Sequence, residues 1–111
     1  MTDTYIQVTV ADFAEKVLQA PHMVVVNFYA EQSNTSQIEE PEVAFVSKEY
    51  QGRVAFVKVN VEEQGELVNQ WNVDGVPTLI FFKGGQELYR IKGIVMRDKL
   101  RRQIEGALLA S

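Results

Sequence analysis

The chain has 111 residues and contains no cysteine. It therefore has no disulfide bond and no thiolate metal ligand. It also cannot carry out thiol–disulfide chemistry with its own side chains, because the thiolate is the reactive group in that chemistry. We expect no metal site and no cofactor.

Basic charge and long apolar runs are also scarce. The formal net charge is −4, which opposes nucleic acid or an anionic membrane as a partner. No apolar run approaches the roughly 20 residues that span a bilayer. The start, Met1-Thr2-Asp3-Thr4, lacks a basic segment followed by an apolar one, so we expect no signal peptide and a cytoplasmic location.

Hydrophobic residues make up 46% of the chain, enough for the core of one domain over residues 1–111. Strand-like and helix-like patterns alternate, which predicts an α/β domain in the order β-α-β-α-β-α-β-β-α. The expected strands are 6–8, 24–30, 54–61, 78–82 and 87–91. The expected helices are 11–20, the segment from the polar cluster 33–36 to about residue 50, a short one around 67–71, and 96–109.

Local signals support several of these boundaries. Thr9 with Asp12 matches a capping box before the first helix. Pro41 lies inside the second helix and should bend it. Residues 83–86, Lys-Gly-Gly-Gln, are typical of a hairpin turn.

Several segments together resemble the thioredoxin family over essentially the whole chain. They are residues 25–31 (VVNFYAE), Pro41, residues 57–61 (VKVNV), residues 71–79 (WNVDGVPTL), residues 82–85 (FKGG) and Gly93. Their order and spacing carry the resemblance. It implies the thioredoxin fold, with a central mixed five-stranded sheet flanked by four helices.

The sequence departs from the family where the family does its chemistry. The family's Trp-Cys-Gly-Pro-Cys-Lys segment corresponds to residues 32–37, Gln-Ser-Asn-Thr-Ser-Gln. The two cysteine positions are Ser33 and Ser36, and the family's buried aspartate aligns with Asn27. An amide cannot take up a proton at neutral pH. We therefore expect no catalytic residue at these degenerate positions and no enzyme activity.

Two origins of the serines are possible: natural divergence, or an oxidoreductase stripped of its cysteines. Natural divergence is favoured, because Gly-Pro, the flanking Trp and Lys, and the buried aspartate have changed as well. A nucleophilic role for either serine would need an adjacent base. The only histidine, His22, precedes the second strand, at the opposite end of the sheet in a thioredoxin fold.

A structural role is the favoured interpretation of the serines. Ser36-Gln37-Ile38-Glu39 matches a capping box at the helix start. Glu39, Glu40 and Glu42 should then complement the positive end of the helix dipole. Phosphorylation of Ser33 or Ser36 stays open.

Other polar and aromatic residues have structural interpretations too. Lys58 should point to solvent or bond to a neighbour, because the family's aspartate is missing. Trp71 is expected in the core. A solvated helix face is expected for Arg97, Lys99, Arg101 and Arg102.

The resemblance also implies a groove that binds extended polypeptides. Its residues would be Tyr29, Gln32, Ser33, Val76, Pro77, Gly93 and Ile94, with a cis Val76–Pro77 peptide whose backbone pairs with the bound segment. The sequence thus predicts a redox-inactive, thioredoxin-like binding or scaffold module whose partner is a protein or peptide segment. The alternatives are a cysteine-free variant of a thiol–disulfide oxidoreductase and a small holdase-type chaperone.

Overall fold

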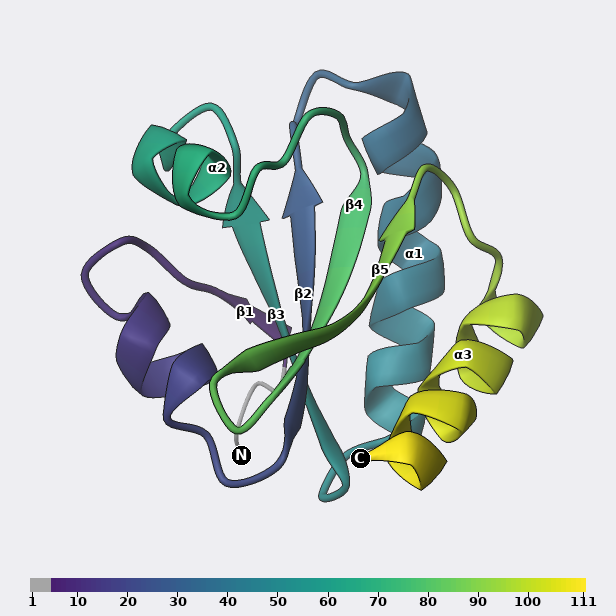
Figure 1. Ribbon diagram of the computed structural model, residues 1–111. Coiled ribbons are helices and arrows are strands. Elements are labelled where there is room, and N and C mark those ends of the chain that lie inside the picture. Colours follow the sequence, from purple (N-terminus) through teal and green to yellow (C-terminus); the bar gives the residue numbers. More distant parts are fainter. Residues whose placement is uncertain (1–4) are drawn as a thin grey trace.

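A central five-stranded sheet forms the middle layer of the protein. The computed structural model describes residues 5–111. Its strands are β1 (Tyr5–Gln7), β2 (Met23–Tyr29), β3 (Val54–Asn60), β4 (Thr78–Lys83) and β5 (Gln86–Lys92). Their order across the sheet is β1-β3-β2-β4-β5. The first three strands run parallel and the β4–β5 hairpin is antiparallel, which confirms the expected mixed sheet (Figure 1).

Strand β2 is buried on both faces, as its continuous apolar sequence predicts. Val24, Val26 and Phe28 pack with Phe13 and other residues on one face of the sheet. Met23 and Val25 point to the other face, where helices α1 (Asn34–Glu49) and α3 (Arg97–Ala110) cover the sheet. The period-two alternation of a strand therefore directs side chains of β2 into two separate clusters.

The first helical segment is shorter than expected. A helix is present within the expected range 11–20, but it covers only the π-helical segment η1 (Ala14–Leu18). The N–H of Gln19 donates to the carbonyl of Ala14 at 2.9 Å, which is the wider i→i+5 turn. The Asp12 carboxylate does accept from the Thr9 N–H at 2.7 Å, but the intervening residues form turns.

Arginines on α3 tie this helix to α1. The guanidinium of Arg97 lies 3.0 Å from Glu42, and that of Arg101 lies 2.7 Å from Glu49. Both guanidinium groups also approach the exposed ring of Phe45, Arg97 at 3.9 Å from its centroid. Both side chains remain partly exposed, and the sequence analysis did not predict their ion pairs with the acidic side chains of α1.

Two smaller expectations are confirmed. The β4–β5 turn places Gly84 and Gly85 at φ 61° and 80°, which suits a two-residue turn that needs positive φ at both positions. Trp71, after α2 (Gly65–Gln70), packs edge-on against Phe82 with centroids 4.8 Å apart. It belongs to the margin of the core.

Within residues 5–111, no helix has the length and apolar character needed to cross a membrane.

Candidate functional site

The loop that follows β2 leads into α1 through Ser33. Ser33 has extended backbone angles, and its Oγ accepts a hydrogen bond from the N–H of Ser36 at 3.2 Å. Its carbonyl already accepts from the N–H of Gln37 at 3.0 Å. These are the properties of an N-cap residue. The first of the two degenerate cysteine positions therefore caps the helix.

The expected capping box beginning at Ser36 was wrong. Ser36 is buried within the first turn of α1. Its Oγ accepts from the N–H of Ala30 at 3.2 Å and so joins the helix to the end of β2. A cap needs an extended backbone and an orphan N–H ahead of it. Ser33 meets this requirement, so the helix begins three residues earlier than the box implied.

The expected acidic complement to the helix dipole was also wrong. The first turn of α1 contains no acidic residue, and the dipole effect falls off within that turn. Glu42 bonds instead to Arg97, and Glu40 lies 3.1 Å from the ammonium group of Lys58. These side chains connect α1 to its neighbours.

Glu39 is fully buried between α1 and the loop after β5. Its Oε1 accepts from the N–H of Val95 at 2.8 Å, whereas its buried Oε2 has no hydrogen-bond partner among residues 5–111. Burial raises the pKa of the Glu39 carboxyl to about 7. The hydrogen bond from Val95 lowers this pKa, and the nearby charge of Glu42 raises it further. A titratable group thus supports the loop that carries Gly93 and Ile94.

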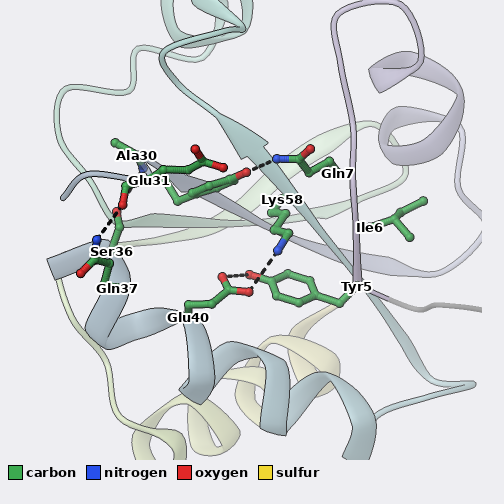
Figure 2. A pocket seen from close by; sticks show the side chains of 10 residues that line it. Tyr5, Ile6, Gln7, Ala30, Glu31, Ser36, Gln37, Glu40 and Lys58 are labelled. Carbon is green, nitrogen blue, oxygen red and sulfur yellow. Dashed lines mark hydrogen bonds and ion pairs between the residues drawn. The ribbon is translucent and has the colours of Figure 1, made fainter. Parts of the chain in front are cut away.

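Asn27 belongs to a polar cluster on the α1 side of the sheet, and Figure 2 shows three other members of it, Tyr5, Glu40 and Lys58. The buried Nδ2 of Asn27 donates to the Tyr5 hydroxyl at 2.8 Å. That hydroxyl donates to Glu40 at 3.1 Å, and Lys58 donates to the other oxygen of the same carboxylate at 3.1 Å. Burial raises the pKa of the Tyr5 hydroxyl. Lys58 therefore bonds to a neighbour, as expected, and Glu40 supplies a carboxylate that β2 lacks.

Tyr5, Glu40 and Lys58 of this cluster line a cavity of about 640 Å³ between α1, β1 and β3. The lining side chains are Tyr5, Ile6, Gln7, Tyr29, Ala30, Glu31, Ser36, Gln37, Glu40 and Lys58. The Tyr29 hydroxyl accepts a hydrogen bond from Gln7, and the Lys58 ammonium lies 5.7 Å from the centre of the Tyr29 ring. The side chain of Tyr29, one of the predicted groove residues, thus faces this cavity.

Near Ser33, the first turn of α1 also contacts residues of the predicted groove. The Val76–Pro77 peptide is cis. The Val76 carbonyl accepts from Thr35 Oγ1 at 3.0 Å. The Pro77 carbonyl accepts from the N–H of Gly93 at 2.8 Å, and Gly93 has φ +89°. These contacts bring together three segments distant in sequence: the start of α1, the turn before β4, and the turn after β5.

The remaining predicted residues fall around this junction or far from it. Ile94 is 42% exposed next to Gly93, and Gln32 is exposed before Ser33. His22 directly precedes β2, whereas Ser33 follows its far end, so roughly 20 Å of strand separates them. Neither serine therefore has a histidine as its base. Nor do residues 5–111 hold a cluster of three or more His, Asp or Glu side chains fit for a metal ion.

Sequence reasoning missed the roles of Thr35, Glu39 and Glu40. For Glu40 a signal existed, because it lies four residues after Ser36 and therefore on the same helix face. Thr35 could also have been noticed, since it introduces a hydroxyl donor at a position where the family's motif has proline. Nothing in the sequence predicted that Glu39 is buried, because an isolated glutamate is ordinarily solvated.

Comparison with known proteins gives a consistent result. The thioredoxin family model matches residues 4–106. Thioredoxin 1 of Nostoc sp. is 32% identical over 102 residues, which cover 92% of this chain and 95% of the relative. A thioredoxin of Synechocystis sp. is 34% identical with the same coverage. A probable thioredoxin-2 of Caenorhabditis elegans is 34% identical over 92% of this chain and 70% of its own length.

Proposed function

Because the chain belongs to the thioredoxin family yet contains no cysteine, we propose that it is a redox-inactive protein-binding or scaffold module. It would act in the cytoplasm, without catalysis. Its partner would be an extended protein segment bound at the junction of Ser33, Val76–Pro77 and Gly93, which we call the groove. The segment would pair with the groove through strand-like backbone hydrogen bonds.

The loss of the dithiol site supports a role other than redox chemistry. Serines occupy both cysteine positions, and each hydroxyl accepts a hydrogen bond from a backbone N–H at or near the start of α1. Asn27, in place of the buried aspartate, donates to Tyr5. The residues that could attack a disulfide, resolve the mixed disulfide and accept a proton are all absent together.

The observation that carries the proposal is the contact between three chain segments beside this loop, at the start of α1, the turn before β4 and the turn after β5. The Gly93 N–H to Pro77 carbonyl bond, at 2.8 Å, joins the turn after β5 to the turn before β4. Val76 is only half-buried there and Ile94 is exposed, so partly accessible apolar side chains border this junction. Apolar side chains beside an extended segment support peptide recognition by strand addition.

Selection of peptides on the immobilised protein tests the proposal. A random dodecapeptide library displayed on phage is selected, and the strongest binder is synthesised with a fluorescent label. Val76→Asp places a charge in the groove and is expected to abolish binding of this peptide. The matched control is Val10→Asp, because Val10 is also partly exposed, at 42%, but lies in the loop after β1.

The outcomes separate the candidate functions. Binding that is lost in Val76→Asp and retained in Val10→Asp, with both variants folded by circular dichroism, supports the groove. Equal binding by both variants would overturn it. Weak retention of many unrelated sequences, together with suppression of aggregation of a denatured test protein, would indicate a holdase instead.

A further inference from the structure

The backbone carbonyls of the groove are already engaged within the chain. The Gly75 carbonyl accepts from Thr78 Oγ1 at 2.7 Å, and the Pro77 carbonyl accepts from the Gly93 N–H. Between them, the Val76 carbonyl accepts from Thr35 Oγ1 at 3.0 Å. Proline has no N–H. A strand that pairs with this turn must therefore use Val76, whose carbonyl is bonded to an exposed side chain from the opposite wall.

The direction of the hydrogen bonds at Thr35 follows from its single hydroxyl proton. A carbonyl only accepts, so Thr35 is the donor to Val76. Thr35 Oγ1 is also 2.9 Å from Ser33 Oγ, and in that contact Ser33 must be the donor. Ser33 Oγ itself accepts from the Ser36 N–H. The result is a directed relay from Ser36 N–H through Ser33 and Thr35 to the Val76 carbonyl.

Such a relay fixes Thr35 more firmly than an isolated surface contact would. Each hydroxyl is polarised by the donor behind it, which strengthens the next bond in the series. The relay begins at a backbone N–H in the first turn of α1, where the partial positive charge of the helix lies. Thr35 is therefore held as a donor pointing across the groove.

We propose that Thr35 is an autoinhibitory latch, whose hydroxyl competes with a bound segment for the Val76 carbonyl. In a strand pair, one residue supplies both its N–H and its C=O to the partner. The Val76 oxygen has a second lone pair, so a segment that pairs with Val76 has to displace the Thr35 hydroxyl or share the oxygen with it. In either case its own bond to this oxygen is weakened. This inference rests on the proposed function, and it identifies the residue that sets the affinity of the groove.

The test uses the phage-selected, labelled peptide described above. Thr35→Val keeps the branched shape of the side chain and removes the donor. We expect it to bind the peptide about two- to tenfold more tightly than the unaltered protein, the range that corresponds to one net hydrogen bond. Thr35→Ser keeps a hydroxyl at the same carbon and should bind like the unaltered protein. Thr35→Ala provides a second donor-free variant should Thr35→Val not fold.

The results distinguish this inference from the function on which it depends. If Val76→Asp abolishes binding while the donor-free variants bind no more tightly than Thr35→Ser, the groove stands and the latch is overturned. Weaker binding by the donor-free variants would also overturn it, since Thr35 would then contact the peptide. If Val76→Asp binds as well as Val10→Asp, the groove proposal fails and the latch fails with it.

Discussion

Glu40 on helix α1 holds the ammonium group of Lys58 on strand β3 at a distance of 3.1 Å. The pair faces the cavity beside β2, and the Tyr5 hydroxyl bonds to the same carboxylate. On β2, the residue that bonds to the Tyr5 hydroxyl is Asn27, whose side chain is an uncharged amide. The helix thus provides a carboxylate for Lys58 although the strand carries none.

A double-mutant cycle measures this pair. Glu40→Gln and Lys58→Met should each lower the free energy of unfolding, and their coupling should be about 0.5–1 kcal/mol, because both side chains are partly screened by solvent. Urea unfolding provides the four values. The Asp74–Lys92 pair, at 3.4 Å and with side chains 72% and 59% exposed, is the control and should couple weakly. Equal coupling in the two pairs would show that the lower exposure of the Glu40–Lys58 pair does not strengthen it.

Glu39 should make stability depend on pH near neutrality. Its carboxyl ordinarily ionises near pH 4.5, and burial raises its pKa to about 7. Between these values the folded chain binds more protons than the unfolded chain, so the free energy of unfolding falls as pH rises through this window. The loss is absent below pH 4.5, complete above pH 7, and on the order of 3 kcal/mol.

Glu39→Gln tests this dependence, because the amide oxygen can still accept from Val95 while the charge is gone. We expect the variant to be more stable than the unaltered protein at pH 8 and similar to it at pH 5. Urea unfolding at both pH values is the measurement. Parallel pH profiles for the two proteins would show that Glu39 does not titrate in this range.

The N-cap role of Ser33 predicts a specific loss of stability. Ser33→Ala removes the acceptor for the Ser36 N–H and should lower the free energy of unfolding by about 1 kcal/mol. Ser33→Asn, which also caps helices, should lose much less. Thermal and urea unfolding of both variants are compared. An alanine variant as stable as the asparagine variant would argue that solvent satisfies the helix start.

Restoring the cysteines should not by itself restore dithiol chemistry. In Ser33→Cys/Ser36→Cys, the amide of Asn27 still cannot accept a proton, so reduction of insulin disulfides should be slow. Adding Asn27→Asp should raise the rate about 10- to 100-fold, towards the contribution of a positioned proton acceptor. A rapid double-cysteine variant, unaffected by the third change, would show that another group, such as Glu40, takes the proton.

The fold could be predicted because the buried strands are continuous apolar runs. Val24 to Tyr29 can only be buried on both faces, and the paired glycines at 84 and 85 require a tight hairpin. The helix cap was harder to predict, because serine occurs at both Ser33 and Ser36 and only the latter has a glutamate three residues on. The contact from the Ala30 N–H to Ser36 decides the matter, and it is a tertiary contact.

The catalytic groups that the candidate site lacks could be predicted from the sequence. The contacts that replace them could not. Alignment to a known motif shows which groups are missing at positions 27, 33 and 36. It does not show that Glu39 is buried, since burial of a lone carboxyl depends on how α1 packs against the turn at Val95. The Thr35–Val76 contact has no signal in the sequence either, because the two residues are 41 positions apart and only the fold brings them together.

The relay from Ser33 through Thr35 to the Val76 carbonyl consists of alcohols and amides. Alcohols are inert to peroxide and glutathione, which interconvert thiols and disulfides. The bonds that hold the two walls of the groove together therefore keep the same strength under oxidative stress and under reducing conditions. The latch, and with it the proposed affinity of the groove, should therefore be the same in oxidising and in reducing buffer.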